Sequence, residues 1–135
     1  MKQAWTVLVD VDGTLAGKYR GERRPLRPGA AVALRRLSEV AEVYLWSVAG
    51  RGNPERLLRE YPELRPHVRG TFDKSALLPD RFGRAICIDD EEIDPAVLAR
   101  ERIIVSTYDA GDQDDGLLVS AADRIVAAIL TGRSG

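Results

Sequence analysis

The chain has 135 residues, close to the commonest size of a single domain, and we expect one domain over residues 1–135 with one core. Its 44% hydrophobic content argues against disorder, and its formal net charge of −1 gives no reason to expect binding to nucleic acid or a membrane. The single cysteine, Cys87, excludes a disulfide within the chain. No apolar run is long enough to span a bilayer, and the N-terminal apolar stretch stops at Asp10, so we expect a cytoplasmic protein without a signal peptide.

The first predicted element is a buried strand. Val7 to Val9 is a continuous apolar run, which is typical of a strand buried on both faces. Because a carboxylate inside such a strand would lose its hydration, we expect Asp10 at the C-terminal end. Residues 16–28 are polar, basic and rich in turn residues, and predict an excursion over that end, in the form of a small β-flap. A helix is expected next, from apolar residues at helical spacing: Ala30, Ala33, Leu34, Leu37 and Ala41.

The middle of the chain continues the alternation. Val43 to Trp46 predicts a second buried strand, which ends at Ser47. Asn53 as N-cap and Pro54 as the first helical residue then predict a helix that stops near Pro62.

Further strands are predicted at residues 68–72, 85–88 and 103–105. A short helix over 94–100 separates the last two, and an acidic loop follows at 108–116. Ser120 and Asp123 have the spacing of a capping box for the last helix, which Gly132 would end. The apolar stripe of that helix is predicted to be Ala122, Ile125, Val126 and Ile129. Alternating strands and helices imply an α/β fold with a parallel sheet covered on both faces.

Asp10, Asp12 and Gly13 form the most informative pattern. Two carboxylates one residue apart follow a strand, and a glycine then allows the backbone to turn away. Oxygen ligands of this kind attract Mg²⁺, and one carboxylate can attack phosphorus while the other handles the leaving group's proton. Aspartate and glycine also favour ordinary turns, so these residues alone leave a turn and a phosphoryl-transfer site equally open.

Polar residues also follow the other predicted strands. Ser47 ends the second, Lys74 comes just beyond the third, and Asp89 and Asp90 follow the fourth. Because the C-terminal ends of parallel strands lie on one edge of a sheet, these side chains are expected to converge with Asp10.

In this order, the chain resembles the haloacid dehalogenase-like superfamily, in its phosphatase branch. The residues that carry the resemblance are Val9-Asp10-Val11-Asp12-Gly13-Thr14-Leu15, then Leu45-Trp46-Ser47, then Lys74, then Ile88-Asp89-Asp90. The first motif is highly specific, whereas the serine and the lysine are informative only through their order. The resemblance implies a three-layer, Rossmann-like fold with the strand order 5-4-1-2-3.

The resemblance also implies a role for each matching residue. Asp10 is similar to the nucleophile that forms an aspartyl-phosphate, and Asp12 to the general acid and base. Ser47 and Lys74 are similar to the hydroxyl and the ammonium group that bind the phosphoryl group. The metal ligands would be the Asp10 carboxylate, the backbone carbonyl of Asp12 and Asp89, with Asp90 beside them. Gly13 and Thr14, within the first motif, are expected to bind substrate too, and Arg51, outside the matching motifs, is a further candidate that could reach the phosphate or the leaving group.

Several points depart from the family pattern or have a simpler interpretation. Ser75 follows Lys74 where many relatives have proline, and Lys18 on the flap is the alternative lysine. Ser47 and the Asp89-Asp90 pair would, on their own, be turn residues. Arg51 is more typical of a solvated loop, and the basic flap of a solvated charged hairpin. The gaps at 16–28 and 48–73 leave no room for a cap domain, which implies an open site.

We therefore expect a Mg²⁺-dependent phosphomonoester hydrolase. Its partner would be a phosphorylated substrate, either a small molecule or a macromolecular end. The alternatives are a nucleic-acid end-processing phosphatase that uses the arginine-rich flap, and a non-catalytic module that binds metal or phosphate on the same fold. The intact residue set favours an enzyme, because a binding module has no need of the acid–base aspartate. The sequence does not specify the substrate or the oligomeric state.

Overall fold

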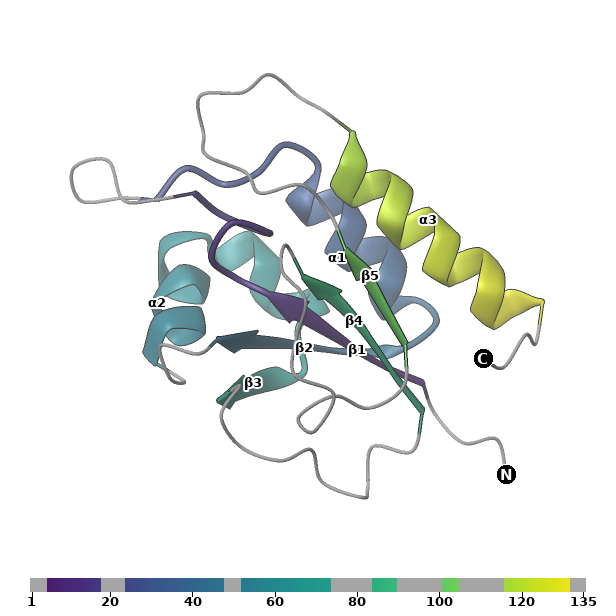
Figure 1. The fold of residues 1–135 in the computed structure, drawn as a ribbon. Helices are drawn as coiled ribbons and strands as arrows, with labels where there is room; N and C mark the ends of the chain where they lie inside the picture. Colours follow the sequence, from purple (N-terminus) through teal and green to yellow (C-terminus); the bar gives the residue numbers. More distant parts are fainter. Residues whose placement is uncertain are drawn as a thin grey trace.

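The computed structural model describes residues 5–17, 24–47, 52–73, 84–89, 101–104 and 116–131. Strands and helices alternate along the chain in this order: β1 (Trp5–Asp10), α1 (Ala30–Ser38), β2 (Glu42–Ser47), α2 (Gly52–Glu60), the 3₁₀ helix η1 (Pro62–His67), β3 (Gly70–Asp73), β4 (Arg84–Asp89), β5 (Glu101–Ile104) and α3 (Leu117–Leu130). The strands form a sheet in the order β3-β2-β1-β4-β5, and each neighbouring pair is parallel (Figure 1). The predicted α/β class with a parallel sheet is confirmed.

Strand β1 lies at the centre of the sheet, as its composition predicts. It pairs with β2 on one side and with β4 on the other, so both of its edges are covered. Val7, Leu8 and Val9 are fully buried, and the strand ends at Asp10. The predicted position of Asp10 at the C-terminal end is confirmed, but the residue is only 5% exposed, so its carboxylate does not keep its hydration there.

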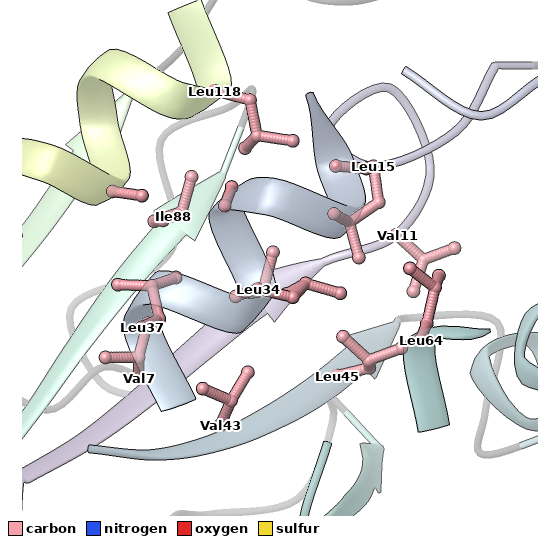
Figure 2. Packing of buried hydrophobic residues seen from close by; sticks show 14 of the residues in the cluster. Val7, Val11, Leu15, Leu34, Leu37, Val43, Leu45, Leu64, Ile88 and Leu118 are labelled. Atoms are coloured by element: carbon pink, nitrogen blue, oxygen red, sulfur yellow. The ribbon is translucent and has the colours of Figure 1, made fainter. Parts of the chain in front are cut away.

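The hydrophobic core lies between one face of the sheet and the helices. Alternate residues of the central strands, such as Val7, Val43 and Ile88, project into it and meet Leu34 of α1 and Leu118 of α3 (Figure 2). Helix α1 contacts both α3 and η1, which brings these three elements to the same face. The apolar residues of α1 recur at helical spacing, and Ala30, Ala33, Leu34 and Leu37 are buried as predicted. Ala41, also predicted for this helix, lies beyond its end at Ser38.

The opposite face of the sheet is also shielded from solvent. Leu8, Trp46 and Cys87 occupy the alternate positions on β1, β2 and β4, and each of them is fully buried. Burial on both faces explains why these three strands read as continuous apolar runs.

The predicted capping box of the last helix is wrong. Helix α3 begins at Leu117, after Gly116 in a left-handed conformation (φ 64°), so Ser120 lies inside its first turn. Asp123 instead accepts a hydrogen bond of 2.7 Å from Arg36 of α1. Spacing alone cannot distinguish a capping carboxylate from one that pairs with a neighbouring helix.

Other boundaries differ by a few residues. Helix α2 begins at Gly52, so Asn53 lies within its first turn and is not the N-cap. Strand β3 begins at Gly70, and Gly70 therefore starts the strand and does not interrupt it. Strand β5 begins two residues before the predicted start, at Glu101, and ends at Ile104. The 3₁₀ helix η1 had no predicted counterpart. The predicted helix over 94–100, the acidic loop at 108–115 and Gly132 lie outside the described residues.

In the part of the chain that the structure describes, no helix combines the length and the apolar character needed to cross a bilayer.

Two glycines with the same backbone conformation offer a matched test of the packing between α1 and α3. Gly29 (φ 85°) and Gly116 (φ 64°) precede these helices, and a Cβ at Gly29 would lie 2.6 Å from Cγ2 of Val119, whereas one at Gly116 would meet nothing within 4 Å. Gly116→Ala should lower the free energy of unfolding by about 1–2 kcal/mol through backbone strain alone. Gly29→Ala should lose about 1–3 kcal/mol more through overpacking.

Urea unfolding of both variants measures this difference. An equal loss in the two variants would show that α1 and α3 do not approach closely at Gly29.

Candidate functional site

The ends of the central strands bring predicted site residues to one level of the sheet. Asp10 pairs with Trp46, and the pairing of Val9 with Ile88 places Asp10 beside Asp89. Ser47 follows Trp46 directly and ends β2. Neighbouring strands are about 4.8 Å apart, so Asp10, Ser47 and Asp89 gather at the carboxyl edge of the sheet.

A tight turn reverses the chain immediately after Asp10. The carbonyl of Val11 accepts hydrogen bonds from the N–H groups of Leu15 (3.0 Å) and Ala16 (3.1 Å). Gly13 has a φ of 78°, a left-handed conformation that glycine adopts without strain, and its N–H donates to the Ala16 carbonyl at 2.9 Å. The turn predicted from the glycine is therefore present. Val11 and Leu15 are fully buried and anchor the turn in the core (Figure 2).

Within this turn, Thr14 holds the carboxylate of Asp10. The Thr14 hydroxyl Oγ1 donates a hydrogen bond of 3.0 Å to Oδ2 of Asp10. Thr14 is fully buried, and Asp10 is only 5% exposed. The bond therefore fixes the orientation of a carboxylate that is largely shielded from water, at the end of a rigid strand. The sequence placed Thr14 among the substrate-binding residues, and its described contact is with the predicted nucleophile.

Asp12 is half exposed and forms an ion pair. Its side chain is 54% exposed, and Oδ1 accepts a hydrogen bond from Nη2 of Arg24. The guanidinium of Arg24 is itself buried, and its Nε donates to the Gly17 carbonyl at 3.0 Å. The two aspartates of the first motif thus have different surroundings, because Asp10 is buried and Asp12 is half exposed.

The excursion after the turn is paired at its base. Ala16 forms an antiparallel bridge with Leu26, and the Gly17 N–H donates to the Pro25 carbonyl at 3.0 Å. The Arg27 N–H donates to the Leu15 carbonyl at 2.7 Å. The base is therefore a short antiparallel ladder, and residues 18–23, which include Lys18, lie outside the described residues.

The expectation of a solvated charged hairpin is wrong for two arginines of the flap. Arg24 is 2% exposed and Arg27 is 1% exposed. Arg27 donates from Nη1 to the Thr14 carbonyl at 3.3 Å, so both guanidinium groups bind the loop that carries the motif. Sequence reasoning missed this arrangement, because nothing in a run of scattered arginines distinguishes those that fold back onto a loop.

The remaining predicted residues are described in part or not at all. Ser47 is 1% exposed at the end of β2. Asp89 ends β4, and only its backbone is described. Arg51, Lys74 and Asp90 lie outside the described residues, although β3 ends at Asp73, directly before Lys74.

The predicted metal site has the right donor chemistry. Mg²⁺ prefers oxygen ligands, and the register brings the ends of β1 and β4, with Asp10 and Asp89, to the same level. Among the side chains that the structure describes, no three histidine, cysteine or acidic groups form a cluster suited to a metal ion. The predicted ligand set depends on Asp89 and Asp90, whose side chains lie outside the part of the chain that the structure describes.

A cavity of about 570 Å³ lies at a different place, at the amino end of β2. Glu42, His67 and Arg69 line it, together with residues from the end of α1. It contains none of the motif residues, because these lie at the carboxyl edge of the sheet.

Comparison with known protein families finds no family model that matches this chain, and comparison with curated protein sequences finds no significant match.

The Thr14–Asp10 hydrogen bond predicts a difference between two substitutions. Thr14→Val keeps the shape of the side chain but leaves the buried Asp10 carboxylate without this donor, and should lower the free energy of unfolding by about 1.5–3 kcal/mol. Thr14→Ser keeps the hydroxyl and should lose less. Urea unfolding at neutral pH measures both, and equal losses would show that the hydroxyl contributes nothing.

Proposed function

We propose that this chain is a Mg²⁺-dependent phosphomonoester hydrolase of the haloacid dehalogenase-like type, acting through an aspartyl-phosphate on Asp10. The observation that carries the proposal is the placement of the first motif. Asp10 is buried at the end of the central strand and oriented by Thr14, while Asp12 stands half exposed two residues further on. A nucleophile needs to be fixed, and an acid–base group needs access to both the leaving group and water.

The fold supports the proposal in two ways. The strand order β3-β2-β1-β4-β5 is the order that the resemblance implies. The face of the sheet opposite α1 carries fully buried apolar residues, Leu8, Trp46 and Cys87, which suit a second covering layer and hence a three-layer fold without a cap domain.

The chemistry proposed for the aspartates has two steps. A carboxylate oxygen of Asp10 forms a bond to phosphorus as the bond from phosphorus to the leaving oxygen breaks, and Asp12 gives that oxygen a proton. Asp12 then takes a proton from a water molecule, whose oxygen attacks phosphorus and releases phosphate and the Asp10 carboxylate.

Ser47 and Lys74 would bind the phosphoryl oxygens in both steps, at the ends of β2 and β3. A hydroxyl and an ammonium group at these places neutralise charge as it develops on the phosphoryl group.

The proposed Mg²⁺ would be held by Asp10, the Asp12 carbonyl, Asp89 and Asp90. When bound, it would supply charge neutralisation for the phosphoryl group. Two observations support the fit of these residues to Mg²⁺. Their ligand atoms are oxygens, and the strand register places Asp10 and Asp89 side by side at the ends of β1 and β4.

Burial of two flap arginines bears on the nucleic-acid alternative. Arg24 and Arg27 are directed to the motif loop and are 2% and 1% exposed, so they are not available to the phosphates of an approaching strand. We therefore favour a phosphomonoester, small or macromolecular, without a need for extended nucleic-acid contacts.

Phosphate release from p-nitrophenyl phosphate and a mixed phosphoester panel, with Mg²⁺ or EDTA, tests the proposal. Activity should require the metal, and Asp10→Asn should abolish it because an amide cannot serve as the nucleophile. Asp123→Asn is the matched control, since this exposed aspartate of α3 lies far along the chain from the motif and pairs with Arg36. Retained activity in Asp10→Asn, with the control active, would remove Asp10 as the nucleophile.

Asp12→Asn separates acid catalysis from the attack itself. The loss should be about 10²–10⁴-fold for an alkyl phosphate, which needs a proton on its leaving oxygen. It should be smaller for p-nitrophenyl phosphate, whose leaving group departs as an anion. Steady-state kcat/KM for both substrates makes the comparison, and an equal loss would contradict the assignment of Asp12 as general acid.

A further inference from the structure

The side chain of Arg24, on the flap, reaches a predicted catalytic carboxylate. Its Nη2 donates to Oδ1 of Asp12, and its Nε donates to the Gly17 carbonyl at 3.0 Å. The same guanidinium thus joins Asp12 of the motif turn to Gly17, at the start of the flap (residues 16–28). The side chain of Arg24 is only 3% exposed, whereas that of Asp12 is 54% exposed.

The backbone of Arg24 is held from a third direction. The hydroxyl of Tyr61, at the junction between α2 and η1, donates a hydrogen bond to the Arg24 carbonyl. Tyr61 is partly buried against the hydrophobic core. The backbone of Arg24 is therefore held to the core by a contact that does not involve Asp12, so the position of the arginine does not depend on the exposed aspartate alone.

We propose that Arg24 is a positioning residue for the acid–base carboxylate of Asp12. This inference rests on the proposed function. Arg24 holds one oxygen of Asp12 at the mouth of the site, so that the carboxylate keeps its place relative to the reacting phosphoryl group on Asp10. Arginine suits the task, because its rigid, planar fork can bind the Gly17 carbonyl and the Asp12 carboxylate at the same time.

Two other arginines can be compared with Arg24. Arg27 is equally buried and donates to the carbonyl of Thr14. Arg36 also pairs with an aspartate, Asp123, but both side chains are exposed, at 41% and 53%. A buried guanidinium loses its hydration, and an apolar residue of similar size often gives the same or greater stability. The burial of Arg24 beside Asp12 is therefore compatible with a role in the reaction, in addition to its contact with the Gly17 carbonyl.

A double-mutant cycle tests the proposal by activity and by stability. Arg24→Met, Asp12→Asn and the double variant are compared for kcat/KM with an alkyl phosphate and with p-nitrophenyl phosphate. Arg24→Met should lower turnover of the alkyl phosphate by about 10²-fold, as expected for a misplaced catalytic group, and should affect p-nitrophenyl phosphate less. In the Asp12→Asn background, the same substitution should cause little further loss, because Arg24 acts through Asp12.

Three further measurements keep the result interpretable if Arg24→Met folds poorly. Tyr61→Phe removes the bond to the Arg24 carbonyl while keeping the guanidinium, and should give a smaller loss with the same dependence on leaving group. Arg36→Met removes an arginine–aspartate pair on α1 and α3 and should leave both activities unchanged. Urea midpoints of the four proteins in the cycle measure the coupling between Arg24 and Asp12 without reference to activity, and should be non-additive.

The outcomes separate this inference from the proposed function. No metal-dependent turnover in the parent protein would overturn both. If the parent is active, two results would overturn the inference alone. One is additive losses of kcat/KM in the double-mutant cycle. The other is an equal loss of kcat/KM for both substrates in the folded Arg24 and Tyr61 variants. Faster turnover of the alkyl phosphate in Arg24→Met would also overturn it, because Arg24 would then restrain Asp12 from giving its proton. Additive urea midpoints would show that the pair is absent in solution.

Discussion

The burial of β1 on both faces and both edges is the constraint on which the rest of this structure depends. β2 and β4 flank the strand, and its residues from Val7 to Val9 are fully buried. Such a strand tolerates a carboxylate only at its end. Asp10 lies there, and the turn through Gly13 brings Thr14 back to donate to it. One buried strand thus determines where the carboxylate lies and how it is oriented.

The parallel arrangement extends this effect to the neighbouring strands. Because β2, β3 and β4 all run in the same direction as β1, they end at the same edge, with Ser47, Asp73 and Asp89 as their last residues. Residues far apart in the chain therefore become neighbours through the pairing of the strands that carry them. The proposed phosphatase chemistry draws on this convergence, since each strand end would contribute one group to a single phosphoryl site.

Residues 24–27, at the C-terminal side of the flap, give the motif turn further support. The two buried arginines among them bind the turn from outside the sheet, Arg24 at Asp12 and Gly17, and Arg27 at Thr14. Hydrogen bonds from the Gly17 N–H to the Pro25 carbonyl and from the Arg27 N–H to the Leu15 carbonyl hold the two sides of the flap together. The turn that carries both aspartates is therefore supported by the core beneath it and by the arginines above it. A rigid support of this kind favours groups that must keep their positions during a reaction.

The sequence by itself determined the α/β class, the central buried strand, the position of Asp10 at its end and the apolar face of α1, because these follow from hydrophobic periodicity and the desolvation of charge. It also indicated which strand ends carry polar residues. Only the tertiary structure decided the partners of individual polar side chains. Asp123 pairs with Arg36 rather than capping α3, Thr14 donates to Asp10, and Arg24 is buried against Asp12. Local spacing describes a segment's own preferences, whereas these contacts join segments that only the folded chain brings together.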